Sequence, residues 1–186
     1  MLFRSWGCPT RVLPSTDDRL RTWIATDAEE IPFQEWLVRR RATDAVAGVR
    51  FEGVPGACPA PGVLAAIADA DRVVLAPSNP FVSLDPILAV DGVRAAVAAR
   101  RDDCVAVSPV IGGKAVKGPL VEMLASMGHR PDAVGVARYL ADLAGAYVLD
   151  PEDAALADEL EQRAIAVPTL MKEPDVRAGL AAAVLA

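Results

Sequence analysis

Short apolar runs alternate with helix-like segments along the C-terminal two thirds of the chain. The runs are continuously apolar, as in "RVVLA" at 72–76 and "CVAVS" at 104–108. Such runs are typical of parallel strands in a sheet that helices cover on both faces. The pattern predicts further strands at 146–150 and 164–169, and helices at 62–70, 92–101, 119–128, 151–163 and 175–186.

Smaller signals refine the ends of these elements. Gly128 is expected to end the helix before it, because glycine readily adopts the left-handed conformation common at that position. Asp91 can cap the helix at 92–101, and Pro151 suits the first turn of the helix that it begins. "AVGVA" at 133–137 favours a strand, or a strand-like entry to a helix at 138–145.

The N-terminal part has a different pattern. "RTWIAT" at 21–26 and "IPFQEWLVRRR" at 31–41 flank the acidic turn "DAEE", which predicts an antiparallel hairpin. Strand alternation gives the second strand two faces: Phe33, Glu35, Leu37 and Arg39 on one, and Gln34, Trp36, Val38 and Arg40 on the other. Neither face is wholly apolar, so the hairpin is a candidate wall of a ligand site or an interface.

Together these patterns predict an α/β fold with a doubly wound, mostly parallel, Rossmann-like sheet and an N-terminal antiparallel hairpin. The chain divides into an N-terminal segment at 1–10, the hairpin and a turn-rich connector at 11–60, and an α/β part at 61–186. The last part is the candidate nucleotide-binding unit.

Composition narrows the classes of function. The 186 residues carry a net charge of −6, which argues against nucleic acid as the main ligand but allows a small phosphorylated ligand in a local basic pocket. No apolar run approaches the roughly 20 residues that span a membrane. "MLFRSWGCPT" lacks the pattern of a signal peptide. We therefore expect a cytoplasmic protein.

Cysteine and histidine limit the chemistry further. Cys8, Cys58 and Cys104 form no CxxC pair and are expected to be reduced thiols. His129 is the only histidine, which excludes a multi-histidine metal site within the chain and leaves one candidate for a catalytic triad. Its position after Gly128 predicts a surface turn rather than a catalytic role.

Two loops that directly follow predicted strands are the main candidates for a ligand site. In an open parallel sheet, ligands bind at the carboxyl ends of the strands, so both loops would face one crevice. In "PSNPFVSLDP" at 77–86, Ser78 and Asn79 can donate hydrogen bonds to a phosphate, a ribose or a base, and the prolines on either side stiffen the loop. A turn that satisfies only its own backbone groups explains the same residues.

The second loop, "SPVIGGKAVKGP" at 108–119, is rich in glycine and lysine. Gly112 and Gly113 let a ligand approach the backbone closely. Lys114 and Lys117 are two of only three lysines in the chain, and with backbone N–H groups they can form a phosphate cradle. The residue order matches neither a Walker A loop nor GxGxxG. A glycine-rich connection with two solvated lysines is the alternative.

Two further groups of charged residues could either bind a ligand or simply face solvent. Asp17 and Asp18 are paired carboxylates that can hold a metal ion, although such a pair is more often a solvated turn. The arginines at 39–41 can pair with an anionic ligand, or face solvent as charge runs at strand ends usually do.

These motifs together resemble one family, the transferases that attach a phospholactyl or phosphoenolpyruvyl group to the deazaflavin Fo and so form the core of coenzyme F-420. The matching stretches, in family order from about Val12, are "VLPSTDDRLRT", "FQEWLVRRR", "FEGVPGACPAPGVLAAIADADRVVLAPSNPFVSLDPIL", "VAVSPVIGGKAVKGP", "GVARYLADLAGAYVLD" and "TLMKEPDVRAGLA". A related non-catalytic family shares the fold but has a glycine-serine loop where this chain has Ser78-Asn79-Pro80, which favours the transferase.

The resemblance implies a reaction. The terminal hydroxyl of the Fo ribityl chain would attack the phosphorus that bears the lactyl or enolpyruvyl group in a guanosine diphosphate ester, and GMP would leave. Such chemistry depends on positioning and charge neutralisation, usually with magnesium. The residues implied to contact the nucleotide, contact its phosphates or shape the same pocket are Ser78, Asn79, Pro80, Ser83, Gly112, Gly113, Lys114 and Lys117. The sequence does not choose between the two donors.

Members of this family are much longer than 186 residues. Their first glycine-rich loop, the acidic residues that bind a divalent metal and the residues that hold the deazaflavin precede the part matched here. The resemblance therefore implies a sheet without its first strands, magnesium ligands outside this chain and an open edge that favours association, as in a homodimer. The alternatives are a catalytically silent nucleotide-binding or regulatory protein of the same fold, and an inactive fragment.

Overall fold

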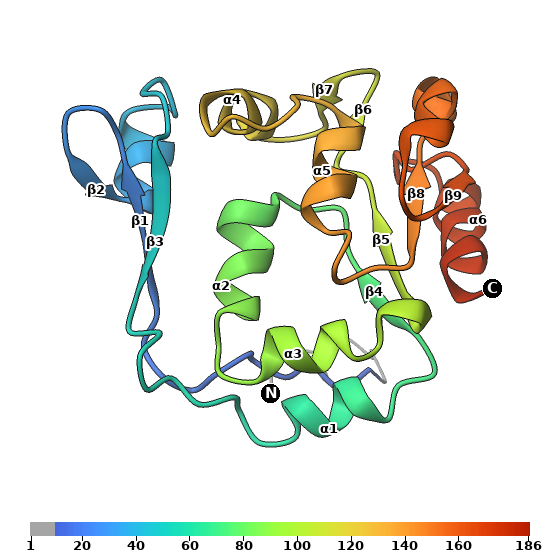
Figure 1. The fold of residues 1–186 in the computed structure, drawn as a ribbon, viewed down its shortest axis with the longest axis horizontal. Helices are drawn as coiled ribbons and strands as arrows, with labels where there is room; N and C mark the ends of the chain where they lie inside the picture. Colours follow the sequence, from blue (N-terminus) through green and yellow to red (C-terminus); the bar gives the residue numbers. More distant parts are fainter. Residues whose placement is uncertain (1–9) are drawn as a thin grey trace.

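The structure is a computed structural model that describes residues 10–186 (Figure 1). It contains a three-stranded antiparallel sheet, a four-stranded parallel sheet and a small two-stranded hairpin. The strands are β1 Arg21–Ala25, β2 Glu30–Pro32, β3 Gly48–Glu52, β4 Val73–Leu75, β5 Cys104–Val107, β6 Val110–Ile111, β7 Lys114–Ala115, β8 Ala146–Leu149 and β9 Arg163–Ala166. The α-helices are α1 Val63–Ala68, α2 Asp85–Leu88, α3 Val93–Ala98, α4 Leu120–Ser126, α5 Ala133–Tyr139 and α6 Pro174–Leu185. Four further helical segments are η2 Glu35–Arg39 and η3 Pro80–Leu84, both π-helical, and η4 Arg101–Asp103 and η5 Pro151–Glu159, both 3-10.

The parallel sheet confirms the α/β prediction. Its strands lie in the order β4-β5-β8-β9, and each neighbouring pair is parallel. Their alternate residues face two separate cores, so both faces of the central strands are buried. This explains why the central strands read as continuous apolar runs.

Helices cover the two faces unequally. On one face, Leu75, Ala106 and Tyr147 belong to the large core that helices α1 to α5 complete. On the other face, Val105 and Val148 pack against α6. Figure 1 shows α5 and α6 on opposite sides of β8. The sheet is therefore doubly wound, with one helix on its second face among the described residues.

The N-terminal hairpin is confirmed in part. β1 pairs antiparallel with β2 and β3, and Ile24 and Ile31 are buried. The predicted second strand at 31–41 is wrong beyond Pro32, because the chain turns into the helical segment η2. Phe33, Trp36 and Leu37 have the i, i+3, i+4 spacing of a helical face, which overrides the predicted alternation.

The prediction of a strand, or a strand-like entry, at 133–137 is also wrong, because these residues begin helix α5. The Asp132 carboxylate caps this helix by accepting a hydrogen bond from the Gly135 N–H at 3.1 Å. Gly135 is required where it lies, since a Cβ there would meet the Arg130 carbonyl oxygen at 1.8 Å. The valines of "AVGVA" indicated a strand, but the capping residue decides the local structure.

Other helix ends differ in detail from the sequence prediction. Gly128, with φ 77°, follows α4 as expected. Asp91 does not cap α3, because Gly92 occupies the N-cap position and no side chain supplies a cap bond there. The predicted helix at 151–163 is the shorter 3-10 segment η5, which starts at Pro151 with Asp150 as its cap.

Candidate functional site

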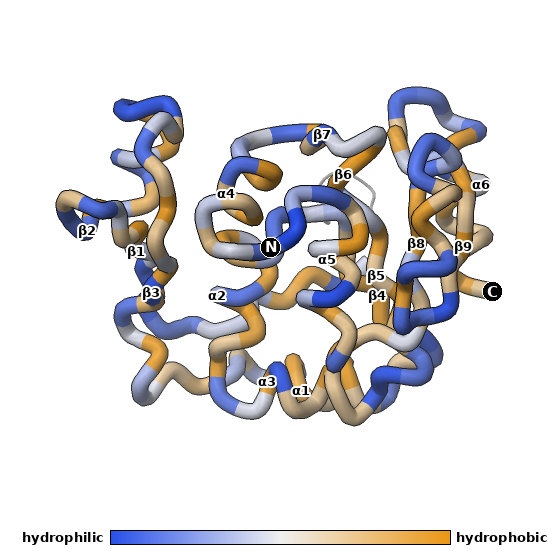
Figure 2. Tube along the Cα trace, turned by 45° about the horizontal axis from the view of Figure 1, so that its top comes forward, coloured by the Kyte–Doolittle hydropathy of each residue, from blue (hydrophilic) through white to orange (hydrophobic). Residues whose placement is uncertain are grey.

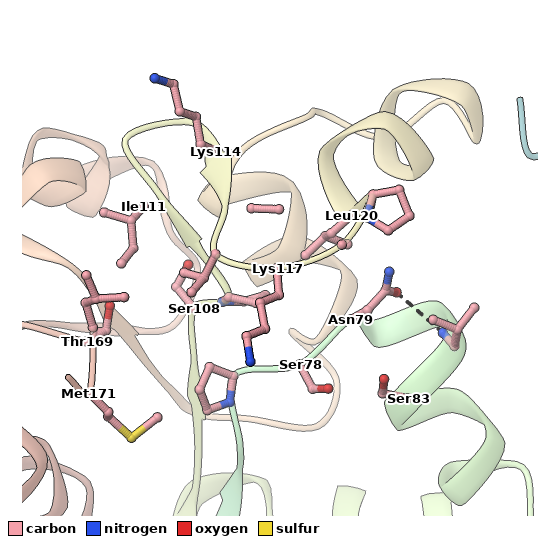
Figure 3. Close-up of a pocket in the computed structure, with 18 of the residues that line it drawn as sticks. Ser78, Asn79, Ser83, Ser108, Ile111, Lys114, Lys117, Leu120, Thr169 and Met171 are labelled. Carbon is pink, nitrogen blue, oxygen red and sulfur yellow. Dashed lines mark hydrogen bonds between the residues drawn. The ribbon is translucent and has the colours of Figure 1, made fainter. Parts of the chain in front are cut away.

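The loops that follow β4 and β5 meet at one cavity of about 890 Å³ on the carboxyl edge of the parallel sheet (Figure 3). Four segments line it: residues 33–37, 77–83, 108–120 and 169–172 contribute its lining side chains. The structure thus brings the two predicted loops together, adds the N-terminal region that was a candidate wall, and adds one wall, residues 169–172, that the sequence prediction did not assign to the site.

The loop after β4 is built around Asn79. The Asn79 Oδ1 accepts hydrogen bonds from the backbone N–H groups of Phe81 at 3.0 Å and Val82 at 3.4 Å, which caps η3. Its Nδ2 lies 3.3 Å from the Met123 Sδ, a weak acceptor. The Asn79 side chain therefore shapes the loop first, and much of its hydrogen-bonding capacity is already used.

The hydroxyl groups of this loop are the groups free for a ligand. Ser78 and Ser83 line the cavity, and neither hydroxyl is bonded to another described residue. Pro80 is buried at the first position of η3 and is not part of the lining. Of the four residues predicted here, Ser78, Asn79 and Ser83 reach the cavity, and Pro80 supports them from behind.

The loop after β5 forms the β6–β7 hairpin and then passes to α4. Gly112 and Gly113 make its turn with φ of 55° and 71°, and neither lines the cavity. The Gly112 N–H donates to the Asp153 Oδ2 at 3.0 Å, so it is already used inside the protein. The two glycines thus serve the turn of the hairpin, not the cavity wall.

The lysines of this loop differ in direction. Lys114 and Lys117 both contribute to the lining. In Figure 3 the Lys117 side chain extends toward Ser78, whereas the Lys114 ammonium points away from the other labelled residues. Lys117 is therefore the better placed of the two to meet a ligand in the cavity.

The segment that follows β9 forms the third wall, and the sequence prediction missed it. Thr169, Leu170, Met171 and Lys172 all line the cavity. Lys172 is the third lysine of the chain, so every lysine in the sequence lies at this one cavity, whereas no arginine lines it. The signal was present, because this segment also leaves the carboxyl end of a parallel strand.

The fourth wall is apolar and comes from the N-terminal region. Phe33, Trp36 and Leu37 face the cavity, and the Phe33 and Trp36 ring centroids lie 6.2 Å apart. The buried Trp36 is fixed by its Nε1, which donates to the Asp44 carbonyl at 3.0 Å. The suggestion that this region lines a ligand site agrees with its position. The cavity has lysines and hydroxyls beside an aromatic and aliphatic wall.

His129 lies in the turn that follows α4, as the sequence predicts, but its side chain packs into an aromatic cluster. It is half-buried, and its ring lies 5.5 Å from Phe81 and 5.3 Å from Tyr139 between centroids. The Tyr139 hydroxyl donates to the Asp85 carboxylate at 2.6 Å. Burial raises the pKa of Asp85, and this hydrogen bond offsets part of the rise. This aromatic cluster packs behind η3 and contributes no residue to the cavity lining.

Two of the other candidate ligand groups, Asp18 and Arg40, have structural partners. The Asp18 Oδ2 accepts from the Cys58 N–H at 2.8 Å, and Arg40 pairs with Glu29 at 2.7 Å. Within residues 10–186, no three histidine, cysteine or acidic side chains lie close enough together to hold a metal ion. Asp17 and Asp18 therefore do not form such a group with another described residue.

Neither of the two described thiols lines the cavity. Cys58 and Cys104 are both free, as predicted, while Cys8 lies outside the described residues. Burial raises the pKa of the Cys104 thiol to about 11, which keeps it protonated near neutral pH. Cys104 is thus a small core residue rather than a nucleophile.

Comparison with known proteins identifies relatives that are longer than this chain. A family model described as "2-phospho-L-lactate transferase CofD" matches residues 1–174. A phosphoenolpyruvate transferase of Streptomyces griseus is 40% identical over 184 residues, which are 95% of this chain and 58% of the relative. A 2-phospho-L-lactate transferase of Methanothermobacter thermautotrophicus is 39% identical over 159 residues, which are 86% of this chain and 50% of the relative. The chain thus spans about half to three fifths of these relatives.

Solved structures support the fold. Protein BH3568 of Bacillus halodurans superposes with a TM-score of 0.69 over 98% of this chain and 64% of its own, at 16% identity. A second structure of that protein, described as a member of the upf0052 family, gives a TM-score of 0.64. At such low identity the likeness concerns the fold alone. No helix within residues 10–186 is both long and apolar enough to cross a membrane.

Proposed function

The chain belongs to the 2-phospho-L-lactate transferase CofD family, and we propose that it takes part in the transfer that builds the core of coenzyme F-420. In this reaction a phospholactyl or phosphoenolpyruvyl group moves from a guanosine diphosphate ester to the deazaflavin Fo, and GMP is released. Family membership supports the class of reaction. The substrates are our proposal, since the chain spans 58% of the Streptomyces griseus relative.

One observation carries the proposal: an acidic chain places all three of its lysines at one cavity. The chain has a net charge of −6, and three lysines placed at random along it would not be expected to lie at the same edge of the sheet. Ammonium groups beside free hydroxyls suit the oxygens of a diphosphate. The charge and donor set therefore favour a phosphorylated ligand over a neutral one.

The apolar wall accounts for the other half of such a ligand. Phe33 and Leu37 can cover a planar ring, because aromatic and aliphatic surfaces pack against π-systems. The lysines lie on other walls of the same cavity. A ligand with a ring at one end and phosphates at the other, such as a guanine nucleotide, fits this division.

The proposed step balances as follows. The terminal ribityl oxygen of Fo bonds to the phosphorus that bears the lactyl or enolpyruvyl group, while the bond from that phosphorus to the bridging oxygen breaks. GMP keeps the bridging oxygen, and the hydroxyl proton passes to solvent. Lys117 and Lys172 would offset the negative charge on the phosphate oxygens, and Ser78 and Ser83 would donate hydrogen bonds to them.

Magnesium, expected from the family, would add charge neutralisation at the same phosphates. No acidic side chain lines the cavity, and the described residues bring together no group of three His, Cys, Asp or Glu side chains, so the cavity by itself offers magnesium no carboxylate ligand. We propose that its ligands come from outside this chain, and the roles given above to the lysines and serines do not depend on it.

Nucleotide binding tests the site directly. In calorimetric titration with GDP, we expect Lys117→Ala to weaken binding about tenfold or more, as loss of a charge-assisted contact does. Arg163→Ala is the matched control, because Arg163 is exposed at the amino end of β9, at the edge of the sheet away from the cavity. If wild-type protein binds no GDP, or both variants weaken binding equally, the assignment of the site fails.

Turnover tests the reaction. The chain is incubated with Fo, magnesium and the guanylylated donor, and GMP release is measured. We expect little turnover by the chain alone and recovery when the remaining part of the Streptomyces griseus relative is added as a separate polypeptide. Rapid turnover by the chain alone would contradict the need for that part. GDP binding without recovered turnover would favour the catalytically silent alternative.

A further inference from the structure

Two buried carboxylates, Asp150 and Asp153, lie behind the cavity and are absent from its lining. They are 8% and 5% exposed, and neither forms an ion pair with a described lysine or arginine. A buried carboxylate is costly unless hydrogen bonds compensate it. The hydrogen bonds that Asp150 and Asp153 accept from the two lysine-bearing loops compensate this cost and indicate what the two carboxylates do.

Asp150 holds the wall that follows β9. Its Oδ2 accepts from the Thr169 N–H at 2.8 Å and from the Thr169 hydroxyl at 3.1 Å. Its Oδ1 accepts from the Glu152 N–H at 3.2 Å, which fixes the carboxylate at the start of η5. Thr169 begins the segment that carries Lys172, so this carboxylate fixes the base of one lysine-bearing loop.

Asp153 holds the other lysine-bearing loop. Its Oδ2 accepts from the Gly112 N–H at the turn of the β6–β7 hairpin, 41 residues away in sequence. Lys114 and Lys117 follow this turn directly. The same short corner, residues 150–153, therefore contacts both loops that bring lysines to the cavity.

We propose that Asp150 and Asp153 are positioning residues, which fix the two lysine-bearing loops relative to each other from behind the cavity. Each acts through neutral N–H or hydroxyl donors and leaves the lysine charges available to a ligand. The consequence for ligand binding rests on the proposed function, whereas the anchoring of the loops does not.

Amide hydrogen exchange tests the anchoring without any ligand. In Asp153→Ala we expect exchange in residues 110–117 to rise at least about tenfold, with little change in 169–172. In Asp150→Ala we expect the reverse pattern. Asp158→Ala is the matched control, since Asp158 is an exposed acid on the same η5. Unchanged exchange in both loops, or a uniform rise across the whole chain, would overturn the proposal.

GDP titration then separates positioning from a general structural role. Asp153→Ala should weaken GDP binding about tenfold, and Asp153→Asn, which keeps an acceptor oxygen for Gly112, should restore it to within about threefold of wild type. When Lys117 is already replaced by alanine, Asp153→Ala should weaken GDP binding much less than it does in the wild type. The reason is that Asp153 acts on binding through the loop that carries Lys117. Full additivity of the two changes would contradict the proposal. If wild type binds no GDP while the exchange pattern holds, the proposed function fails and the anchoring stands.

Discussion

At the scale of single residues, the shape of the site depends on side chains whose hydrogen bonds go mainly to the protein's own backbone. Asn79 illustrates this. Its position between two prolines indicated a ligand contact, yet its carboxamide oxygen caps η3. A residue can therefore be essential to the shape of a loop while contributing little direct contact. The two roles predict different outcomes for different substitutions.

Asn79→Ala removes the cap and should lower the free energy of unfolding by about 1 kcal/mol, measured by urea denaturation. Asn79→Asp keeps an acceptor oxygen and should retain most of that stability, since Asp is an equally good cap. The aspartate places a negative charge at the cavity, so it should weaken GDP binding. If Asn79→Asp unfolds as easily as Asn79→Ala, the capping role is wrong.

Asp85 predicts a pH dependence of stability. Burial raises its pKa in the folded state above the ordinary value of 3.8, so the folded protein binds this proton more tightly than the unfolded chain does. The stability linked to this proton is fully present below the unfolded pKa and is lost as pH rises through the folded pKa. Asp85→Asn cannot ionise and can still accept from Tyr139.

We therefore expect the stability of Asp85→Asn relative to wild type to increase as pH rises above about 4, in urea denaturation at several pH values. A constant difference across this range would show that the Asp85 carboxyl has no raised pKa. Asp91→Asn is a suitable control, because Asp91 is exposed and does not cap α3.

At the scale of elements, η2 places the aromatic wall of the cavity. A strand over residues 31–41 would have put Phe33 and Trp36 on opposite faces, whereas the helical turn puts Phe33, Trp36 and Leu37 together. Trp36 is buried almost completely and its Nε1 donates to the Asp44 carbonyl, which ties the turn to the chain that follows it.

Trp36→Ala should therefore cost about 3–5 kcal/mol of unfolding free energy and disorder this wall. Trp23→Ala is the matched comparison, because Trp23 is only half-buried on the neighbouring sheet and donates to Glu52. Trp23→Ala should lower the free energy of unfolding clearly less than Trp36→Ala does. Equal costs in denaturant titration would mean that η2 does not depend on Trp36.

The sequence predicted the strands of the parallel sheet better than it predicted the short helical segments near Trp36 and Asp132. Continuous apolar runs identified the parallel strands, because strands buried on both faces leave little ambiguity. The helical residues at 35–39 and 133–137 were misassigned because β-branched and aromatic residues favour strands locally, while a cap at Asp132 and packing of Trp36 decide the structure. Both are interactions with groups outside the segment.

The same limit applies to the site. The rule that ligands bind at strand carboxyl ends located the loops with Ser78 and Lys117 correctly in space. It also applied to Thr169 and Lys172, but nothing in the composition of that segment distinguished it. The N-terminal region was a candidate wall from its mixed faces, but the predicted strand separated Phe33 and Leu37 from Trp36, so the apolar face that lines the cavity could not be predicted.

At the scale of the whole molecule, strand β4 forms an edge of the parallel sheet that is suited to association with a second polypeptide. β4 pairs only with β5 in the described structure, and Val74 on its second face is 40% exposed. Figure 2 shows apolar stretches in β4 and at the C-terminal end of α6. A strand that pairs on one side only among residues 10–186, and that carries an exposed apolar side chain, favours pairing with another polypeptide.

We expect the chain to associate in a concentration-dependent way, and Val74→Lys to weaken this association without lowering the melting temperature. Val38→Lys is the control, since Val38 is 66% exposed on η2 and outside the parallel sheet. Sedimentation equilibrium measures the effect. A monomer at all concentrations, or equal effects of both changes, would contradict a role of the β4 edge.

The confinement of lysine to one cavity has a practical consequence for chemical labelling. Every side-chain amine of the chain belongs to Lys114, Lys117 or Lys172, so an amine-reactive reagent modifies side chains at this cavity and nowhere else. Acylation rates read by mass spectrometry, peptide by peptide, would then report occupancy of the cavity in the unmodified sequence. A collection of candidate ligands could be ranked by how well each shields the Lys117 amine compared with that of Lys114, which points away from the other labelled residues, without engineering a reporter into the protein.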